Sequence, residues 1–309
     1  MRQDWHPGND TIFPDFPRYK SVYNEIMKHI YRALLFVALL FSWQGVAAQE
    51  LKIISFNIRY NSWNNIDGEN GWPYRKAAVV RMILEERPAA IGLQEALIDQ
   101  LQYLDSNLPG YQRIGVGRDD GKEAGEFMAI YYDTAQLRLD GSQTLWLSET
   151  PEVPSKGWDA ACYRTATVAN FFDRQSHRNF YYINTHLDHM GKTARAESVK
   201  FIASFFTPSM SALIVPAIVG GDMNSSILDT ALLAFEYVHL RPACDMVSTA
   251  LCHAITYNAY GKGPGASIDH FFVRGGIEVK QYRILDGDYG VPYISDHYPI
   301  EMVIEFYNY

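Results

Sequence analysis

The stretch AAIGLQEALIDQLQYLDSNL, residues 89–108, changes character at Gln94 and Glu95. The residues before this pair, 89–93, form a short apolar run that is typical of a buried strand. The residues after it, 96–108, repeat apolar side chains at the spacing of an amphipathic helix, and Pro109-Gly110 ends that helix. A strand that ends in a polar pair and leads into a helix is the unit from which α/β folds are built.

The same kind of unit precedes this stretch, and further strands and helices follow it. Upstream, residues 51–56 predict a strand that ends at Asn57, and Pro73 is placed to begin a helix that runs to about Glu86. Downstream, the apolar patterns predict strands at 127–132, 143–147, 165–172, 180–184, 213–219, 267–273, 281–285 and 299–306, and helices at 192–206 and 227–235. No internal repeat and no linker interrupts this series, so we expect one α/β domain in which helices cover two mixed sheets.

Composition and charge exclude several classes of protein. The 309 residues are 48% hydrophobic and 20% charged, which excludes general disorder, and the 22 glycines and 14 prolines are too few for a low-complexity chain. Three cysteines are too few for a disulfide scaffold. The formal net charge is −8, and there is no basic run, so we expect no stable complex with nucleic acid.

The N-terminal segment has the three parts of a secretory signal. A short basic start at 27–32 precedes the apolar run 33–43, and the small residues 46–48 suit cleavage before Gln49. A buried core helix is the alternative, but the order of the parts favours a signal peptide at 27–48, with translation starting at Met27. Residues 1–26 are then an upstream extension outside the fold, and 49–309 form the domain.

Export would make the protein periplasmic or secreted. The apolar run is shorter than the roughly 20 residues that cross a bilayer, so we expect no integral membrane span after processing. An oxidising compartment permits a Cys244–Cys252 disulfide with Cys162 left as a buried thiol, and three buried thiols are the equally supported alternative.

Polar residues gather at the ends of the predicted strands. One edge of an α/β sheet is where such proteins assemble their sites. Each cluster alone has an ordinary structural explanation, such as a turn or a helix cap, but six of them together favour a functional site. The clusters are Phe56-Asn57, Leu93-Gln94-Glu95, Asn184 to His189, Gly220 to Asn224, Ser267 to His270, and Ser295-Asp296-His297.

Five of these segments, taken in order, resemble the signature blocks of the endonuclease/exonuclease/phosphatase (DNase I-like) superfamily. The blocks are Leu93-Gln94-Glu95, Thr185-His186-Leu187, Gly221-Asp222-Met223-Asn224, Ser267-Ile268-Asp269-His270-Phe271 and Ser295-Asp296-His297-Tyr298-Pro299. The resemblance implies a four-layer α/β/β/α sandwich of two mixed β-sheets flanked by helices, and Mg²⁺-dependent cleavage of a phosphate ester. Residues 72–76 and 162–167 resemble the deadenylase-like and uncharacterised bacterial branch.

The resemblance also implies a set of metal ligands. Glu95 corresponds to the principal ligand, with Asn57 beside it and Asp296 as a candidate second carboxylate. Mg²⁺ prefers such hard oxygen ligands and keeps several of its waters, and Mn²⁺ is the expected substitute.

The remaining blocks imply the catalytic groups. Asp222 can orient or deprotonate the attacking water, and Asn224 can hydrogen-bond a phosphoryl oxygen. His297, oriented by Asp269, can stabilise the charge of the transition state, and His186 contacts the phosphate from the other side.

Substrate binding is the least determined part of the prediction. Arg164 can clamp a phosphate with two hydrogen bonds or form a structural salt bridge, and the sequence supports both equally. The segments expected to choose the substrate are 60–71, 115–126, 148–161 and 257–265.

The predicted protein is a monomeric phosphoesterase that hydrolyses a phosphodiester or a phosphomonoester by in-line attack of an activated water. Three alternatives remain: a non-catalytic binding module with the same fold, a nuclease specific for DNA or RNA, and a zinc hydrolase that uses His186, His189 and His297. The chain has no His-Glu-x-x-His sequence, and its oxygen-rich ligands favour Mg²⁺ over Zn²⁺.

Overall fold

A computed structural model describes residue 25 and residues 27–32, 50–206 and 215–307. The division of the chain into two units falls between Ala47 and Ala48. Residues 27–32 are helical. The rest of the predicted extension and signal peptide, apart from residue 25, lies outside the described residues, so these boundaries stay predictions.

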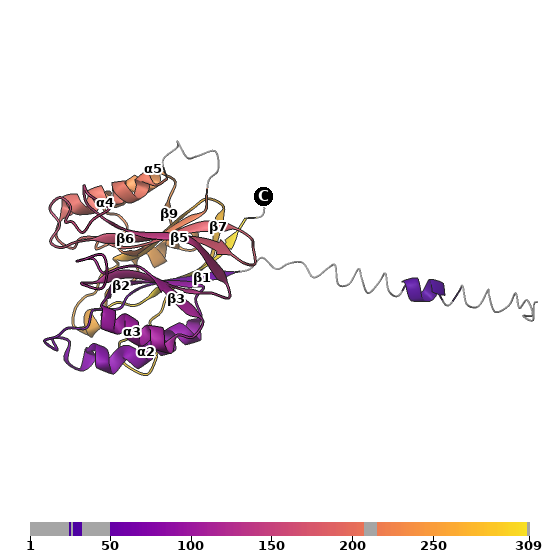
Figure 1. The fold of residues 1–309 in the computed structure, drawn as a ribbon, viewed down its shortest axis with the longest axis horizontal. Helices are drawn as coiled ribbons and strands as arrows, with labels where there is room; N and C mark the ends of the chain where they lie inside the picture. Colours follow the sequence, from indigo (N-terminus) through magenta and orange to yellow (C-terminus); the bar gives the residue numbers. More distant parts are fainter. Residues whose placement is uncertain (1–24, 26, 33–49, 207–214, 308–309) are drawn as a thin grey trace, which may run out of the picture. The chain divides into compact units, whose positions relative to one another are not determined.

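Two mixed sheets of six strands make up the middle of the domain (Figure 1). The first sheet has the order β11-β12-β1-β2-β4-β3 and the second the order β5-β6-β7-β8-β10-β9. In each sheet one pair is parallel, β1 with β2 and β7 with β8, and the other pairs are antiparallel. The strands are β1 (Leu51–Asn57), β2 (Ala90–Ala96), β3 (Tyr111–Ile114), β4 (Phe127–Asp133), β5 (Leu137–Trp146), β6 (Thr165–Asp173), β7 (Asn179–His186), β8 (Ala217–Asp222), β9 (Arg241–Pro242), β10 (Asp269–Arg274), β11 (Ile277–Ile284) and β12 (Ile300–Phe306).

Helices cover the outer face of each sheet. In Figure 1, α2 (Trp72–Glu86) and α3 (Ile98–Asn107) lie over the first sheet, and α4 (Lys192–Ser204) and α5 (Leu233–Tyr237) lie over the second. The buried apolar side chains accordingly form three clusters, one between the two sheets and one beneath each pair of helices. The predicted four-layer α/β/β/α sandwich is confirmed.

A polar contact ties the two sheets together close to their strand ends. Gln94 Nε2 donates to Asn184 Oδ1 of the other sheet over 2.6 Å and to Ser55 Oγ over 3.0 Å. Gly92 makes this approach possible, because a Cβ atom at that position would lie 2.7 Å from the Asn184 side chain. The three side chains are buried, so their hydrogen bonds avoid the cost of unpaired polar groups.

Several predicted elements differ from the observed ones. The short strands β3 and β9 were not predicted, and β5 begins six residues before the predicted 143–147. Leu137 to Asp140 alternate between apolar and polar residues, but Gly141 and Ser142 interrupt this pattern before the predicted strand. The predicted helix 227–235 is a 3₁₀ turn, Thr230–Leu232, followed by α5. Asp229 caps this turn by accepting a hydrogen bond from the Ala231 N–H, which moves the start of the helix beyond the expected position.

The cysteines settle the alternatives that the sequence left open. Cys244 and Cys252 form a disulfide, so the interpretation as three thiols is wrong. Cys162 is free, but it is half-buried where the sequence predicted a buried thiol. Within the described residues, no helix is both long and apolar enough to cross a membrane.

Candidate active site

The predicted site residues meet where strands of both sheets end. Asn57 and Glu95 come from β1 and β2 of the first sheet, and His186, Asp222 and Asp269 come from β7, β8 and β10 of the second. In the second sheet Asp222 pairs with His186 on β7 and with Asp269 on β10, so these three side chains are neighbours.

Glu95 reaches the site through an irregular backbone. The pairing of β2 with β4 shifts between Leu93 and Ala96, and Glu95 has the left-handed backbone angle φ = +60°. The bulge sends Gln94 between the sheets and Glu95 into the site. A residue other than glycine in this conformation is uncommon, and such strain concentrates at functional sites.

Asn57 connects the carboxylates of the two sheets. Its Nδ2 group donates to Glu95 Oε1 and to Asp222 Oδ2, each over 3.0 Å, and its Oδ1 accepts the Arg59 backbone N–H over 3.0 Å. The structure therefore shows Asn57 as a bridge between two acids, and its role as a metal ligand stays a prediction.

His297 forms the expected pair with Asp269. The Nδ1 group of His297 donates to Asp269 Oδ2 over 2.8 Å, and its Nε2 atom lies 3.7 Å from Asp222 Oδ2. Burial alone would lower the pKa of His297, but the Asp269 and Asp222 carboxylates outweigh burial and raise this pKa to about 10. His297 is therefore a cation at neutral pH.

Asp222 has the environment of a proton acceptor. Burial, together with the charge of Asp269, raises the pKa of Asp222 to about 7. The Asn57 amide and the Asn224 backbone N–H, which donates to Asp222 Oδ1 over 2.9 Å, oppose this shift. A base poised near neutral pH is what activation of a water requires.

His186 is the neutral histidine of the site. Burial and the nearby guanidinium groups of Arg164 and Arg118 lower its pKa well below the ordinary value. The Asn224 Nδ2 group donates to the Leu187 carbonyl and to His186 Nε2, each over 2.9 Å. The ring proton therefore lies on Nδ1, and both N–H groups of Asn224 are engaged, so a contact of Asn224 with a phosphoryl oxygen stays a prediction.

The carboxylates of Glu95 and Asp296, the two acidic residues predicted as metal ligands, both lie near the Arg59 guanidinium. Glu95 Oε2 and Asp296 Oδ2 each lie 3.8 Å from the Arg59 guanidinium, so the two carboxylates converge on one region. Burial raises the pKa of Asp296, and a cation beside it would favour the charged form. Oxygen donors of this kind suit Mg²⁺ or Mn²⁺. Asp222, Asp269 and His297 also lie close enough to hold a metal ion. The hydrogen bond between His297 Nδ1 and Asp269 Oδ2, however, already occupies two of their possible ligand atoms.

Arg164 forms the salt bridge that was one of its two predicted roles. Its Nε group donates to Asp188 Oδ2 over 3.2 Å, and one Nη group lies 3.0 Å from His189 Nδ1. Its other Nη group is buried and, within the described part of the chain, has no hydrogen-bond partner. The salt bridge therefore leaves one arm of the guanidinium for a ligand, and the phosphate clamp stays a prediction.

Three charged residues near the site were missed in the sequence. Arg59 ion-pairs with Asp67 over 3.2 Å beside the carboxylates, and Arg118 bonds both oxygens of Glu126 over 2.6 and 2.9 Å. Burial and the charge of Glu95 raise the pKa of Glu126 to about 7. Arg118 and Glu126 lie in the segment 115–126 that was expected to choose the substrate, but no apolar strand precedes Arg118 to mark it.

Arg75 holds the loops that surround the site. This buried arginine of α2 donates hydrogen bonds to the backbone carbonyls of Ile58, Arg59, Asn70 and Ile294. It thereby fixes the segments that follow β1 and precede Asp296.

Replacing this arginine with methionine is expected to destabilise the fold. Arg75→Met keeps the length of the side chain but leaves buried carbonyls without donors, so we expect a loss of about 3 kcal/mol in the free energy of unfolding. Urea unfolding measures it. Arg81→Met, which changes an exposed arginine of the same helix, should lie within about 0.5 kcal/mol of wild type. Equal stability of the two variants would contradict the anchoring role.

Known proteins share this sequence pattern and this fold. The model of the family described as "Endonuclease/Exonuclease/phosphatase family" matches residues 54–297. A family protein from Bacteroides vulgatus is 32% identical with a TM-score of 0.77, over 84% of this chain and 100% of that one. A family protein from Bacteroides thetaiotaomicron is 31% identical with a TM-score of 0.76, and the match covers 84% of this chain and 98% of that one. A mannosyl-6-phosphatase from B. thetaiotaomicron is 32% identical with a TM-score of 0.76, and the match covers 83% of this chain and 100% of that one.

Proposed function

Since the chain belongs to the endonuclease/exonuclease/phosphatase family, we propose that it is a phosphoesterase that hydrolyses a small phosphate ester with the help of Mg²⁺. One observation carries the proposal: Asp222, a base with a pKa near neutral pH, lies beside the cationic His297. The side-chain amide of Asn57 joins Asp222 to Glu95. A proton acceptor, a fixed positive charge and a carboxylate for a metal ion are what phosphate-ester hydrolysis needs.

The residues divide the reaction between them. Asp222 takes a proton from the attacking water, whose oxygen forms a bond to phosphorus. The bond from phosphorus to the ester oxygen breaks at the same time, and this oxygen leaves with the bonding electrons and takes a proton from solvent water to give the alcohol. His297, held by Asp269, donates a hydrogen bond to a phosphoryl oxygen as negative charge develops there. The free Nη group of Arg164 provides a further donor. Mg²⁺, held by Glu95 and Asp296 with Asn57 beside them, would polarise the phosphoryl group, and Mn²⁺ would substitute for it.

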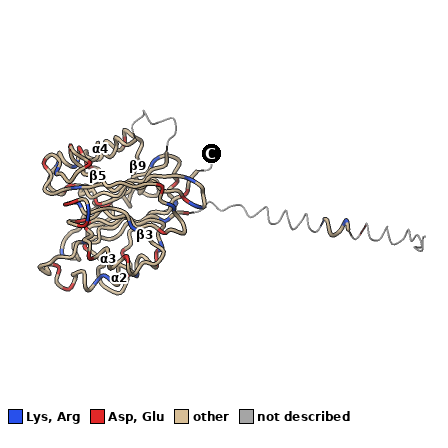
Figure 2. Tube along the Cα trace, viewed as in Figure 1, with Lys and Arg blue, Asp and Glu red and all other residues tan. Residues whose placement is uncertain are grey.

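A small phosphomonoester is the substrate that the observations favour over nucleic acid. The formal charge of −8 and the absence of a basic run give little attraction for a long polyanion, and Figure 2 shows basic and acidic residues interspersed along the domain. A relative that is 32% identical carries the name mannosyl-6-phosphatase. The negative charge accordingly favours no stable nucleic-acid complex, and we propose that the protein works as a monomer.

A metal panel tests the proposal. The protein is stripped with EDTA, and hydrolysis of p-nitrophenyl phosphate, bis(p-nitrophenyl) phosphate and single-stranded DNA is followed with Mg²⁺, Mn²⁺ or Zn²⁺. We expect Mg²⁺ and Mn²⁺ to restore turnover of the monoester. Activation by Zn²⁺ alone would indicate a zinc hydrolase, cleavage of DNA alone would indicate a nuclease, and no turnover with any metal would indicate a binding module.

Export to the periplasm or the medium forms part of the proposal. The basic, apolar and small-residue parts of 27–48 support it, and the Cys244–Cys252 disulfide suits an oxidising compartment. We expect Gln49 as the first residue of protein recovered from its native cell. Terminal sequencing by mass spectrometry would detect it, and an intact Met1 or Met27 would count against export.

A further inference from the structure

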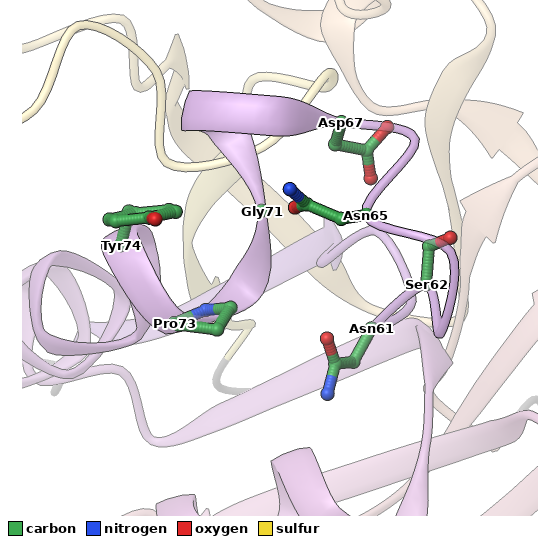
Figure 3. Close-up of a pocket in the computed structure, with 7 residues that line it drawn as sticks. All are labelled: Asn61, Ser62, Asn65, Asp67, Gly71, Pro73 and Tyr74. Atoms are coloured by element: carbon green, nitrogen blue, oxygen red, sulfur yellow. The ribbon is translucent and has the colours of Figure 1, made fainter.

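A polar cavity opens between the loop after β1 and the start of α2. It has a volume of about 300 Å³ and is lined by Asn61, Ser62, Asn65, Asp67, Gly71, Pro73 and Tyr74 (Figure 3). Figure 3 shows that the lining side chains come from two sides, the loop and the first turn of the helix, with Asn65 reaching toward Gly71.

Hydrogen bonds and ion pairs connect the wall of this cavity to the catalytic residues. The backbone N–H of Tyr60, next to Asn61, points at Glu95 Oε2 over 3.4 Å. Asp67 bonds Arg59 through both carboxylate oxygens over 3.2 Å, and Arg59 lies 3.8 Å from Glu95. The Arg59–Asp67 ion pair therefore links the wall of the cavity to the predicted metal ligand.

The lining of the cavity offers hydrogen-bonding groups without net charge. In the part of the chain that the structure describes, the side chains of Ser62, Asn65 and Tyr74 make no hydrogen bond to protein, so their donors and acceptors are open to a ligand. Asp67 is the charged member, and Arg59 neutralises it. Such a surface suits a neutral group with several hydroxyls, whereas a second phosphate would meet no unpaired cation there.

An exposed tryptophan adds an aromatic surface to the same loop. Trp63 lies between Ser62 and Asn65 in sequence, and its side chain is 95% exposed. A flat ring at this position can stack on the apolar face of a sugar.

We propose that this cavity binds the alcohol part of the substrate and selects phosphate esters of neutral polyhydroxylated alcohols, such as hexose phosphates. The inference rests on the proposed phosphoesterase function and names its substrate class. The phosphate would lie at the catalytic residues, and the hydroxyls would bond Ser62, Asn65 and Tyr74.

A comparison of two monoesters tests this inference. Mannose 6-phosphate carries hydroxyls, and p-nitrophenyl phosphate carries none, so the ratio of their kcat/KM values reports on hydroxyl recognition. The variants are Ser62→Ala, Tyr74→Phe and Asn65→Gly, because glycine tolerates the positive φ of +48° at that position. We expect each variant to lower the ratio about 2- to 10-fold, the worth of one hydrogen bond. Tyr237→Phe, at an exposed tyrosine of α5, is the matched control and should leave the ratio unchanged.

The outcomes separate this inference from the function that it rests on. If wild-type protein hydrolyses neither monoester with any metal, the proposed function is wrong. If it hydrolyses p-nitrophenyl phosphate and the variants leave the ratio unchanged, or if a mononucleotide is turned over faster than every hexose phosphate, the function stands and the substrate inference is overturned. A ratio that falls in the three variants and not in Tyr237→Phe supports the inference.

Discussion

Glu95→Gln is expected to reduce turnover by roughly 10²–10³-fold and to raise the Mg²⁺ concentration needed for half-maximal rate, because a metal ion contributes several kcal/mol of transition-state stabilisation. Glutamine keeps the size of the side chain but removes the negative charge that would hold the cation. Metal titration of p-nitrophenyl phosphate hydrolysis measures both effects, and circular dichroism verifies the fold.

A control variant and a contradicting outcome accompany the prediction for Glu95. Glu85→Gln removes the charge of an exposed glutamate on α2 and should leave rate and metal titration unchanged. A folded Glu95→Gln variant with the metal titration of wild type would show that Glu95 does not hold the metal.

Asp269→Asn and His297→Ala are expected to reduce turnover by similar amounts, roughly 10²–10⁴-fold each, the range for a positioned acid–base group. The His297 Nδ1–H donates to Asp269 over 2.8 Å, and the carboxylate keeps the ring protonated. Because the two groups serve one function, the double variant should be little slower than His297→Ala alone. Turnover and melting temperature of all three variants measure the effect.

Asp269 also has a structural explanation, since its backbone N–H bonds Thr256 Oγ1 over 3.1 Å where β10 begins. If that were its whole role, Asp269→Asn would lower the melting temperature and keep turnover per folded molecule. Thr256→Val removes this anchor and leaves the carboxylate, so it serves as the control for stability. Rate losses that multiply in the double variant would show that Asp269 and His297 act independently.

The strands and helices that carry the site could be predicted because their apolar runs are long and end in polar residues. Residues 51–57 and 89–95 became β1 and β2 within a residue or two, and Asp222, Asp269 and His297 came together as expected. Apolar runs that end in polar residues are local signals, and they predicted the strands. The ordered family motifs predicted which polar residues come together.

The residues that were missed act through contacts that no apolar pattern marks. Arg118 meets Glu126, eight residues further along the same loop, and the anchoring role of Arg75, which was not predicted either, depends on a segment 219 residues away. No spacing rule encodes such a contact, because it depends on where a loop lies after the sheets have packed. The weak strands β3 and β9 were missed for a related reason, since an edge pairing needs its neighbour to be in place.

The contact of Gln94 with Asn184 between the two sheets has a consequence for how the protein would tolerate mutation. Each sheet carries only part of the proposed catalytic residues, and the 3.0 Å hydrogen bond from Asn57 to Asp222 joins the two sheets. A core substitution that shifts one sheet by a fraction of an ångström would leave each half intact and misalign the pair. We therefore expect many core substitutions to reduce activity before they unfold the protein.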